Sequence, residues 1–191
     1  ELIMALIKDG STGNTVKVND ENQMHVFSVT SDVAGDSAVK GTAWNLNTGN
    51  VTITGDATLI FLKNTTPNNF VLDAIACGLS DGITFTDKPY LTFWKGVTGG
   101  DLVTDATPVL MNENRNFGYT DTFPGQTFTG KVGGTVTGGE QVALHMIGGG
   151  RSFAEVGFVI PPQASFAMTL TLNGTGSADM YSVIIGHFHH H

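Results

Sequence analysis

Apolar residues alternate with other residues along most of this chain, and this period of two constrains the fold more than any other feature. Within residues 165–174 the apolar positions are Phe166, Met168, Leu170 and Leu172. Because successive side chains of a strand point to opposite faces, the pattern predicts a half-buried antiparallel strand. Helix signals are nearly absent. The alternation therefore predicts an all-β fold.

Further strands are expected at intervals along the sequence. "TLIFLKN" at 58–64 is apolar on both faces, which predicts a strand in the middle of a packed sandwich. Trp44 and Leu46, then Val51 and Ile53, alternate on either side of Thr48-Gly49, which predicts a β-hairpin. The other expected strands are 24–29, 70–79, 90–96, 126–138, 140–149, 154–160 and 180–188.

These strands define the expected domain organisation. Eight to ten strands on one core favour an antiparallel β-sandwich in its jelly-roll form, at residues 25–188. Residues 1–24 are polar and turn-rich after a short apolar segment, which indicates an N-terminal arm or edge hairpin. Residues 98–126 predict a long surface excursion with one short strand. Residues 189–191 are expected to be a His-rich tail or tag.

The charge composition excludes some classes of function. Lys and Arg total 9 against 17 Asp and Glu, so the net charge is −8 and no basic cluster exists to bind nucleic acid. No apolar run approaches the ~20 residues that span a bilayer, so no membrane partner is expected. Charged residues are only 14% of the chain, well below the roughly 25% of typical soluble proteins. Burial against copies of itself or a partner would explain such a surface.

Candidate chemistry is sparse, and we expect no catalytic, cofactor or metal site. His187 and His189 would face the same side of a strand, as metal ligands do, but terminal histidines more often belong to a tag. His25 and His145 lie singly in strand patterns. "IGGGRSF" at 147–153, which includes Arg151, lacks the pattern of a phosphate loop and predicts a turn.

Other polar residues and the single cysteine also have structural explanations. Carboxylates occur singly, and sequence spacing does not say whether any two come close enough for glycosidase chemistry. Cys77 in an apolar stretch is expected to be a buried small hydrophobe. The isolated carboxylates are Asp32, Asp36, Asp56, Asp73, Asp81, Asp87, Asp101 and Asp121. Asn-x-Thr triplets begin at Asn50, Asn64 and Asn173 and arise by chance in a Thr-rich chain.

One pattern resembles a known family. "IKDGSTGNTVKVNDENQ" followed by "AWNLNTGNVTITGDATLIFLKN" is similar to structural proteins of tailed bacteriophages, in particular capsid decoration or cement proteins, over the first third of the chain. The resemblance implies a non-enzymatic β-sandwich, often trimeric, on the outer surface of a virion capsid. The implied partners are sister copies and the major capsid protein.

The N-terminal arm is the expected capsid contact. Its apolar segment could dock in a capsid groove, and its polar stretch has too little apolar surface to fold alone. The expected contact residues are Leu2, Ile3, Leu6, Ile7, Lys8 and Lys17.

Two other classes of function share the predicted fold. A carbohydrate-binding module or receptor-binding fibre head would stack sugars on exposed aromatic side chains, and the candidates are Tyr90, Trp94, Phe117 and Tyr119. Trp44 and Trp94 are more simply explained as core residues. A polysaccharide lyase or hydrolase is the third class, with no local motif to support it.

Overall fold

The computed structural model describes residues 37, 40–80, 82–100, 107–108, 111–114, 116, 118, 121–129, 132–147 and 151–189. These residues belong to a compact unit that comprises residues 33–191. The expected arm at 1–24 and the expected strand at 24–29 lie outside the described residues. So do the six expected capsid-contact residues.

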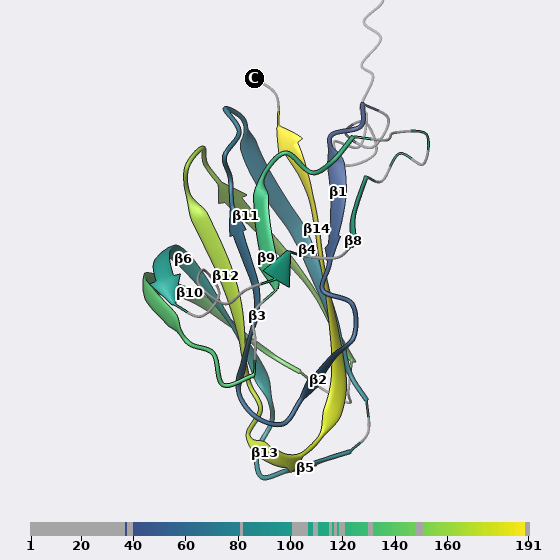
Figure 1. Ribbon diagram of the computed structural model, residues 1–191, viewed down its shortest axis with the longest axis vertical. Coiled ribbons are helices and arrows are strands. Elements are labelled where there is room, and N and C mark those ends of the chain that lie inside the picture. Colours follow the sequence, from purple (N-terminus) through teal and green to yellow (C-terminus); the bar gives the residue numbers. More distant parts are fainter. Residues whose placement is uncertain are drawn as a thin grey trace, which may run out of the picture. The chain divides into compact units, whose positions relative to one another are not determined.

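The described chain is built from antiparallel strands, as the alternation predicts (Figure 1). Their bounds are β1 Ala43–Asn47, β2 Val51–Ile53, β3 Ala57–Lys63, β4 Asn69–Leu79, β5 Ile83–Phe85, β6 Tyr90–Gly100, β7 Thr107–Pro108, β8 Met111–Asn114, β9 Gln126–Thr129, β10 Val136–Met146, β11 Arg151–Ile160, β12 Ser165–Thr171, β13 Gly174–Gly176 and β14 Ala178–His189.

In the described part of the chain, two six-stranded sheets share one hydrophobic core, which gives a β-sandwich-like fold. The first sheet has the order β11-β4-β14-β1-β8, with β2 also paired to β14. The second has the order β10-β6-β12-β3-β9-β7. Strands β5 and β13 form a separate ribbon. Four of the strand pairs, β1–β14, β3–β12, β4–β11 and β6–β10, join early strands to late strands in reverse order.

The core takes side chains from the inner faces of both sheets. The first sheet contributes Leu46, Phe70, Ile75 and Ile184, and the second contributes Ile60, Leu62, Leu91, Phe93, Phe166, Met168 and Leu170. Trp44 lies in this core against Phe123, at a ring-centroid distance of 5.4 Å. The placement of Trp44 in the core is therefore confirmed, and so is the central position of β3 between β12 and β9.

The expected hairpin at Thr48-Gly49 is wrong. Strands β1 and β2 do not pair with each other, because both pair with β14. Asn47 pairs with Val183 and Val51 with Met180. The chain therefore advances four residues between β1 and β2 while β14 advances three. Gly49 has a φ of 66°, and its left-handed conformation serves a bulge in one long strand. Thr48-Gly49 therefore interrupts the pairing with β14 and does not reverse the direction of the chain.

Three other expectations about bounds need correction. The segment 126–138 is divided between β9 and β10, and β10 continues into the expected strand at 140–149 as far as Met146. The expected excursion at 98–126 contains two short strands, β7 and β8, which belong to different sheets. Beyond the expected end of the sandwich, β14 continues to His189, which is paired with Asn69.

Candidate functional site

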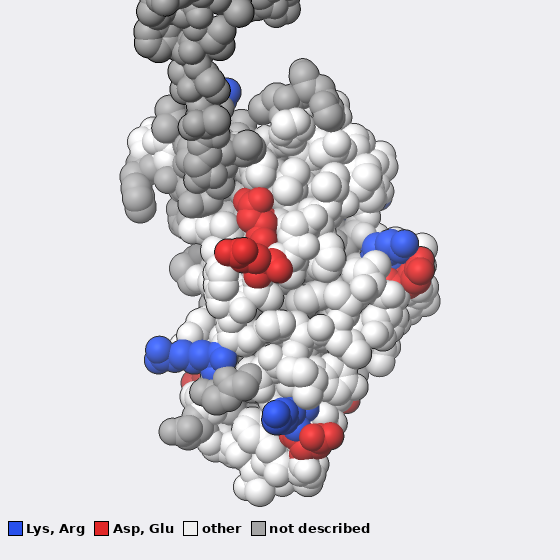
Figure 2. Space-filling model, turned by 180° about the vertical axis from the view of Figure 1, so that it is seen from behind, with Lys and Arg blue, Asp and Glu red and all other residues white. Residues whose placement is uncertain are grey.

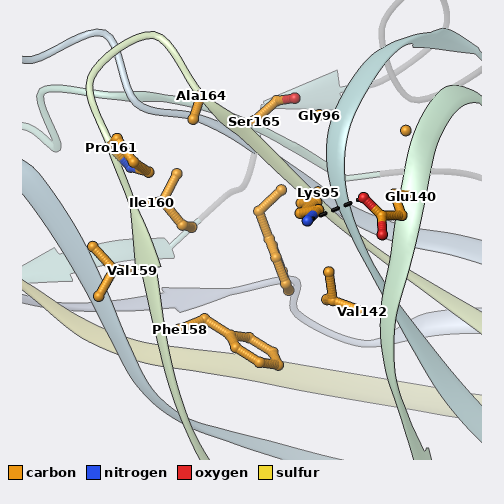
Figure 3. A pocket seen from close by; sticks show the side chains of 12 residues that line it. Lys95, Gly96, Glu140, Val142, Phe158, Val159, Ile160, Pro161, Ala164 and Ser165 are labelled. Carbon is orange, nitrogen blue, oxygen red and sulfur yellow. Dashed lines mark ion pairs between the residues drawn. The ribbon is translucent and has the colours of Figure 1, made fainter.

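An apolar cleft of about 610 Å³ opens between the edge strands β10 and β11 (Figure 3). It is lined by Lys95, Gly96, Gly139, Glu140, Val142, Phe158, Val159, Ile160, Pro161, Ala164, Ser165 and Phe166. Both sheets contribute to the lining, since β6 and β10 belong to one sheet and β11 to the other. The cleft is therefore a gap between the sheets at one edge of the sandwich.

Glycines and bulges shape this edge. Gly96 and Gly139 adopt φ values of 66° and 82°, and the register of β10 against β6 shifts between Gln141 and Ala143. Val142 occupies that shift and lines the cleft. A β-carbon on Gly139 would lie 2.9 Å from the carbonyl oxygen of Lys95, so a larger residue would push the two strands apart. The local sequence "TGGEQV" thus fixes the shape of the cleft wall.

The cleft offers apolar contact and one ion pair. Lys95 Nζ lies 3.0 Å from Glu140 Oε2, with both side chains more than half exposed. Such a pair contributes at most about 1 kcal/mol. The Ser165 hydroxyl donates to the carbonyl of Val97. The rings of Phe158 and Phe166 lie 6.3 Å apart. The lining suits an apolar group, and its one serine hydroxyl is engaged by a backbone carbonyl.

Exposed apolar side chains continue along the outer side of β10. Leu144 is 56% exposed and Met146 is 51% exposed. Their register partners on β6, Thr92 and Tyr90, extend the same outward face. We call Leu144 and Met146 the β10 row. Scattered apolar residues are ordinary on a protein surface, but two neighbours beside an apolar cleft indicate a contact surface.

The outward face of the sheet β11-β4-β14 is also largely apolar. Register pairs place Phe153 beside Ala76 and Ala76 beside Val183, and the next rows are Arg151–Gly78–Tyr181 and Glu155–Ala74–Ile185. We call these nine residues the outer face. Phe153 is 59% exposed, whereas the small residues of β4 form a lower floor between β11 and β14. Figure 2, the view from behind, is mostly white, with acidic side chains near its middle.

His187 is a buried residue of β14 and not part of a loose tail. Its Nδ1 lies 3.0 Å from Asp73 Oδ2, and the side chain is 6% exposed. Asp73 sits where the register of β4 shifts against both β11 and β14. Among the described residues no group of three or more His, Cys, Asp or Glu is placed to hold a metal ion. The expected same-side placement with His189 therefore forms no ligand cluster.

His145 makes the only serine–histidine contact recorded among the described residues. Its Nε2 meets the hydroxyl of Ser152 and so links the two edge strands. No described residue bonds to Nδ1, the atom by which a third group orients a catalytic histidine. The pair ties β10 to β11.

The carboxylates that sequence analysis singled out have separate places. Asp56 accepts the backbone N–H of Leu172, and Asp87 accepts that of Lys88. Asp32, Asp36, Asp81 and Asp101 lie outside the described residues. Asp121 is exposed.

Asn64 illustrates a motif with a structural role. It is 1% exposed, and its amide donates to the carbonyls of Asn68 and Ile160 at 2.7 and 2.8 Å. Its Oδ1 accepts from the N–H and hydroxyl of Thr66. The side chain of this Asn-x-Thr triplet is thus enclosed in the folded protein and inaccessible as a sugar acceptor.

The aromatic candidates for sugar stacking are only partly placed. Trp94 is half-buried, its indole N–H donates to Thr169 Oγ1 at 3.0 Å, and it packs against Phe61, Val97 and Ala167. Tyr90 is half-buried on the same strand. Phe117 and Tyr119 lie outside the described residues. The glycines at 148–150 also lie outside them, between the end of β10 and Arg151 at the start of β11.

No helix in the described part of the chain is long and apolar enough to cross a membrane. The chain matches no family model, no curated protein and no solved structure.

Proposed function

We propose that the sandwich is a jelly roll. A jelly roll is a long antiparallel hairpin of strands rolled into two sheets, so its first strand pairs with its last and its second with the last but one. The support is the strand order: β1 pairs with β14, β3 with β12, β4 with β11 and β6 with β10. These four pairs alternate between the two sheets, as rolling requires.

We propose further that the chain is a non-enzymatic structural protein of a virion, which decorates and stabilises a phage capsid. Its partners in this proposal are the major capsid protein and copies of itself. The resemblance carried by residues 7–23 and 43–64 supports this function, and proteins of that kind are often trimeric. The low charge is consistent with a surface that is largely covered by partners.

The observation that carries the proposal is the edge of the sandwich at β10. There the apolar cleft and the exposed β10 row lie on the same strand. An apolar segment of a neighbouring protein could fill the cleft and cover Leu144 and Met146. Burial of a large apolar side chain contributes about 1.5–3 kcal/mol when complete, so two half-exposed side chains and the cleft supply a useful part of a binding free energy.

The geometry also favours a binding role over catalysis. The cleft contains apolar side chains and an exposed ion pair, and Ser152 and His145 lack an orienting acid among the described residues. We therefore propose no hydrolytic turnover on polysaccharide, ester or peptide substrates. Activity abolished by Ser152→Ala or His145→Ala would contradict this.

The proposal is tested by attachment to virions. Mass spectrometry should detect the chain in purified virions, and the purified protein should co-sediment with capsids stripped of it. We expect Leu144→Asp combined with Met146→Asp to weaken co-sedimentation at least about tenfold, because a charged group in a buried contact is unfavourable. Phe85→Asp is the matched control, since Phe85 is 44% exposed on β5, which belongs to neither six-stranded sheet.

Two results would overturn the proposal. One is absence of the chain from virions together with no capsid binding. The other is binding on a glycan array that Trp94→Ala abolishes, which would favour the carbohydrate-binding alternative.

A further inference from the structure

The outer face contains a pattern that is complementary to itself. Arg151, Phe153 and Glu155 are successive outward residues of β11, because their register partners Gly78, Ala76 and Ala74 all point away from the core. Residues two apart in a strand lie about 6.8 Å apart. A positive and a negative group therefore flank an exposed aromatic ring at equal distances.

Neither Arg151 nor Glu155 has an ion-pair partner among the described residues. The ion pairs recorded there are Lys95–Glu140 and His187–Asp73, and neither includes Arg151 or Glu155. Both side chains are exposed. Asp73, the other carboxylate near this line, already lies against His187. Arg151 and Glu155 are thus available to a partner.

We infer that the outer face binds a second copy of this chain about a twofold axis that lies in the interface and runs across the strands. That rotation reverses the strand direction, so Arg151 faces Glu155 of the partner subunit and Phe153 faces the partner's Phe153. A twofold axis along the strands, over β4, would instead set Arg151 against the partner's Tyr181 and Glu155 against the partner's Ile185, which leaves both charges without a partner. The alternating charges select the first arrangement.

The remaining rows of the outer face agree with this arrangement. The row of Arg151 ends at Tyr181, and the row of Glu155 ends at Ile185. Exchange of these two rows sets Tyr181 against Ile185 of the partner subunit, which pairs a large aromatic with a large aliphatic side chain. The middle row faces itself, with Val183 against the partner's Val183. Two sheets packed this way lie about 10 Å apart.

A second copy is more readily bound by the outer face than by strand pairing at the edge of β11. The register of β11 shifts between Glu155 and Phe158, and Gly157 has a φ of 60°. Bulges of this kind interrupt the row of backbone groups that a neighbouring strand would need. The edge of β11 is therefore poorly suited to continuing the sheet into another copy.

The size of the face sets the expected affinity. Three strands about 4.8 Å apart and three rows about 6.8 Å apart give roughly 300 Å² per copy, less than half of a standard interface. The net charge of −8 on each copy also opposes association. We expect a weak dimer, with a dissociation constant on the order of 10 µM. The inference does not depend on the capsid proposal, and each fails in a different experiment.

Variants of the full chain with single reversed charges test the inference. Sedimentation velocity measures their association at protein concentrations of about 1–200 µM. We expect the unmodified chain to dimerise, and Arg151→Glu or Glu155→Arg alone to weaken dimerisation at least about tenfold. The two single variants, when mixed, should form a heterodimer. The double variant R151E/E155R should dimerise again, because it restores the opposite charges with their positions exchanged.

A matched pair of apolar substitutions tests the central contact. Phe153→Ala should weaken dimerisation at least about tenfold, whereas Phe85→Ala, at another exposed phenylalanine but on β5, should leave it unchanged. Thermal unfolding of each variant checks that it is folded. A monomer at 200 µM, a trimer without dimers, or association unaffected by the single charge reversals would overturn the inference.

Discussion

The ring of Tyr181 on β14 lies over Gly78 on β4. A β-carbon at Gly78 would overlap Cε1 and Cζ of Tyr181 and lie 2.6 Å from its Oη. Gly78 and Tyr181 are register partners on the outward face. The absence of a side chain at residue 78 therefore lets an aromatic ring cover the sheet.

We expect Gly78→Ala to displace this ring and to lower the free energy of unfolding by about 1–2 kcal/mol. The loss should be smaller in a Tyr181→Ala background, because the displaced group is then missing. Chemical denaturation of the two single variants and the double variant measures this. Gly55→Ala is the control, because a β-carbon at residue 55 would meet nothing within 4 Å and the free energy should change little. An equal loss in both backgrounds would contradict the overlap.

Thr48→Val should destabilise the fold by about 1–3 kcal/mol. The Thr48 hydroxyl accepts the backbone N–H of Ser182 at 3.0 Å and lies 3.1 Å from its hydroxyl, at the bulge that joins β1 to β2. Valine leaves these buried groups without a partner. Urea denaturation measures the loss, with Thr84→Val on exposed β5 as the control. A loss no larger than that of the control would show that the bulge does not need the hydroxyl.

Asn64→Ala should lower the free energy of unfolding by about 2 kcal/mol or more, because the carbonyls of Asn68 and Ile160 lose a buried donor. Asn64→Asp should be at least as harmful, since its second oxygen would face those two carbonyls. Asn50→Ala, at an exposed triplet of the same kind, should be nearly neutral. Thermal unfolding ranks the three variants, and a mild Asn64→Asp effect would contradict the assigned amide orientation.

Cys77 should make stability fall at alkaline pH. Burial raises the pKa of its thiol from 9.0 to about 11. In the unfolded chain the thiol loses its proton near pH 9, so the unfolded state is favoured as the pH rises from 9 to 11. Below pH 9 the buried thiol contributes about 2–3 kcal/mol to the free energy of unfolding, and this contribution is lost as the pH rises to 11. Denaturation at pH 8 and pH 10.5 should show this loss in the unmodified chain and less of it in Cys77→Ala. Equal slopes in the two proteins would refute it.

Deletion of residues 1–24 should leave the sandwich folded, because residues 33–191 form a compact unit by themselves. Thermal unfolding should remain cooperative, while attachment to capsids should weaken severely if Leu2, Ile3, Leu6 and Ile7 dock there. A truncated chain that aggregates would indicate that this segment is an edge strand. One that decorates capsids normally would rule out the arm as the capsid contact.

Strand existence was predictable from the sequence, because burial on one face leaves a period of two. Phe166, Met168 and Leu170 show this pattern and lie in the core as expected. Strand pairing was not predictable. Thr48-Gly49 has turn residues, yet tertiary bonds to Ser182 hold it in a bulge, and no local signal distinguishes the two outcomes.

The candidate surfaces were harder to predict for a related reason. Both alternating sets of "EQVALHM" contain apolar residues, so the sequence did not say which would be exposed. Leu144 faces outward because the register of β10 shifts between Gln141 and Ala143, next to it. Phe153 faces outward on an edge strand, which alternation alone does not identify. His187 was assigned near a tail because its partner Asp73 is 114 residues away in sequence.

The position of β14 has a consequence for how the protein is made. Residues 178–189 pair with β4 on one side and with β1 and β2 on the other. Until the ribosome has synthesised them, β4 and β1 have no neighbour between them, and their apolar faces stay open to other chains. Because these contacts join distant parts of the chain, folding should be slow. Nascent chains on the same messenger RNA can therefore pair with one another incorrectly. Slower translation would not prevent this, because β4 and β1 have no neighbour between them until β14 is synthesised.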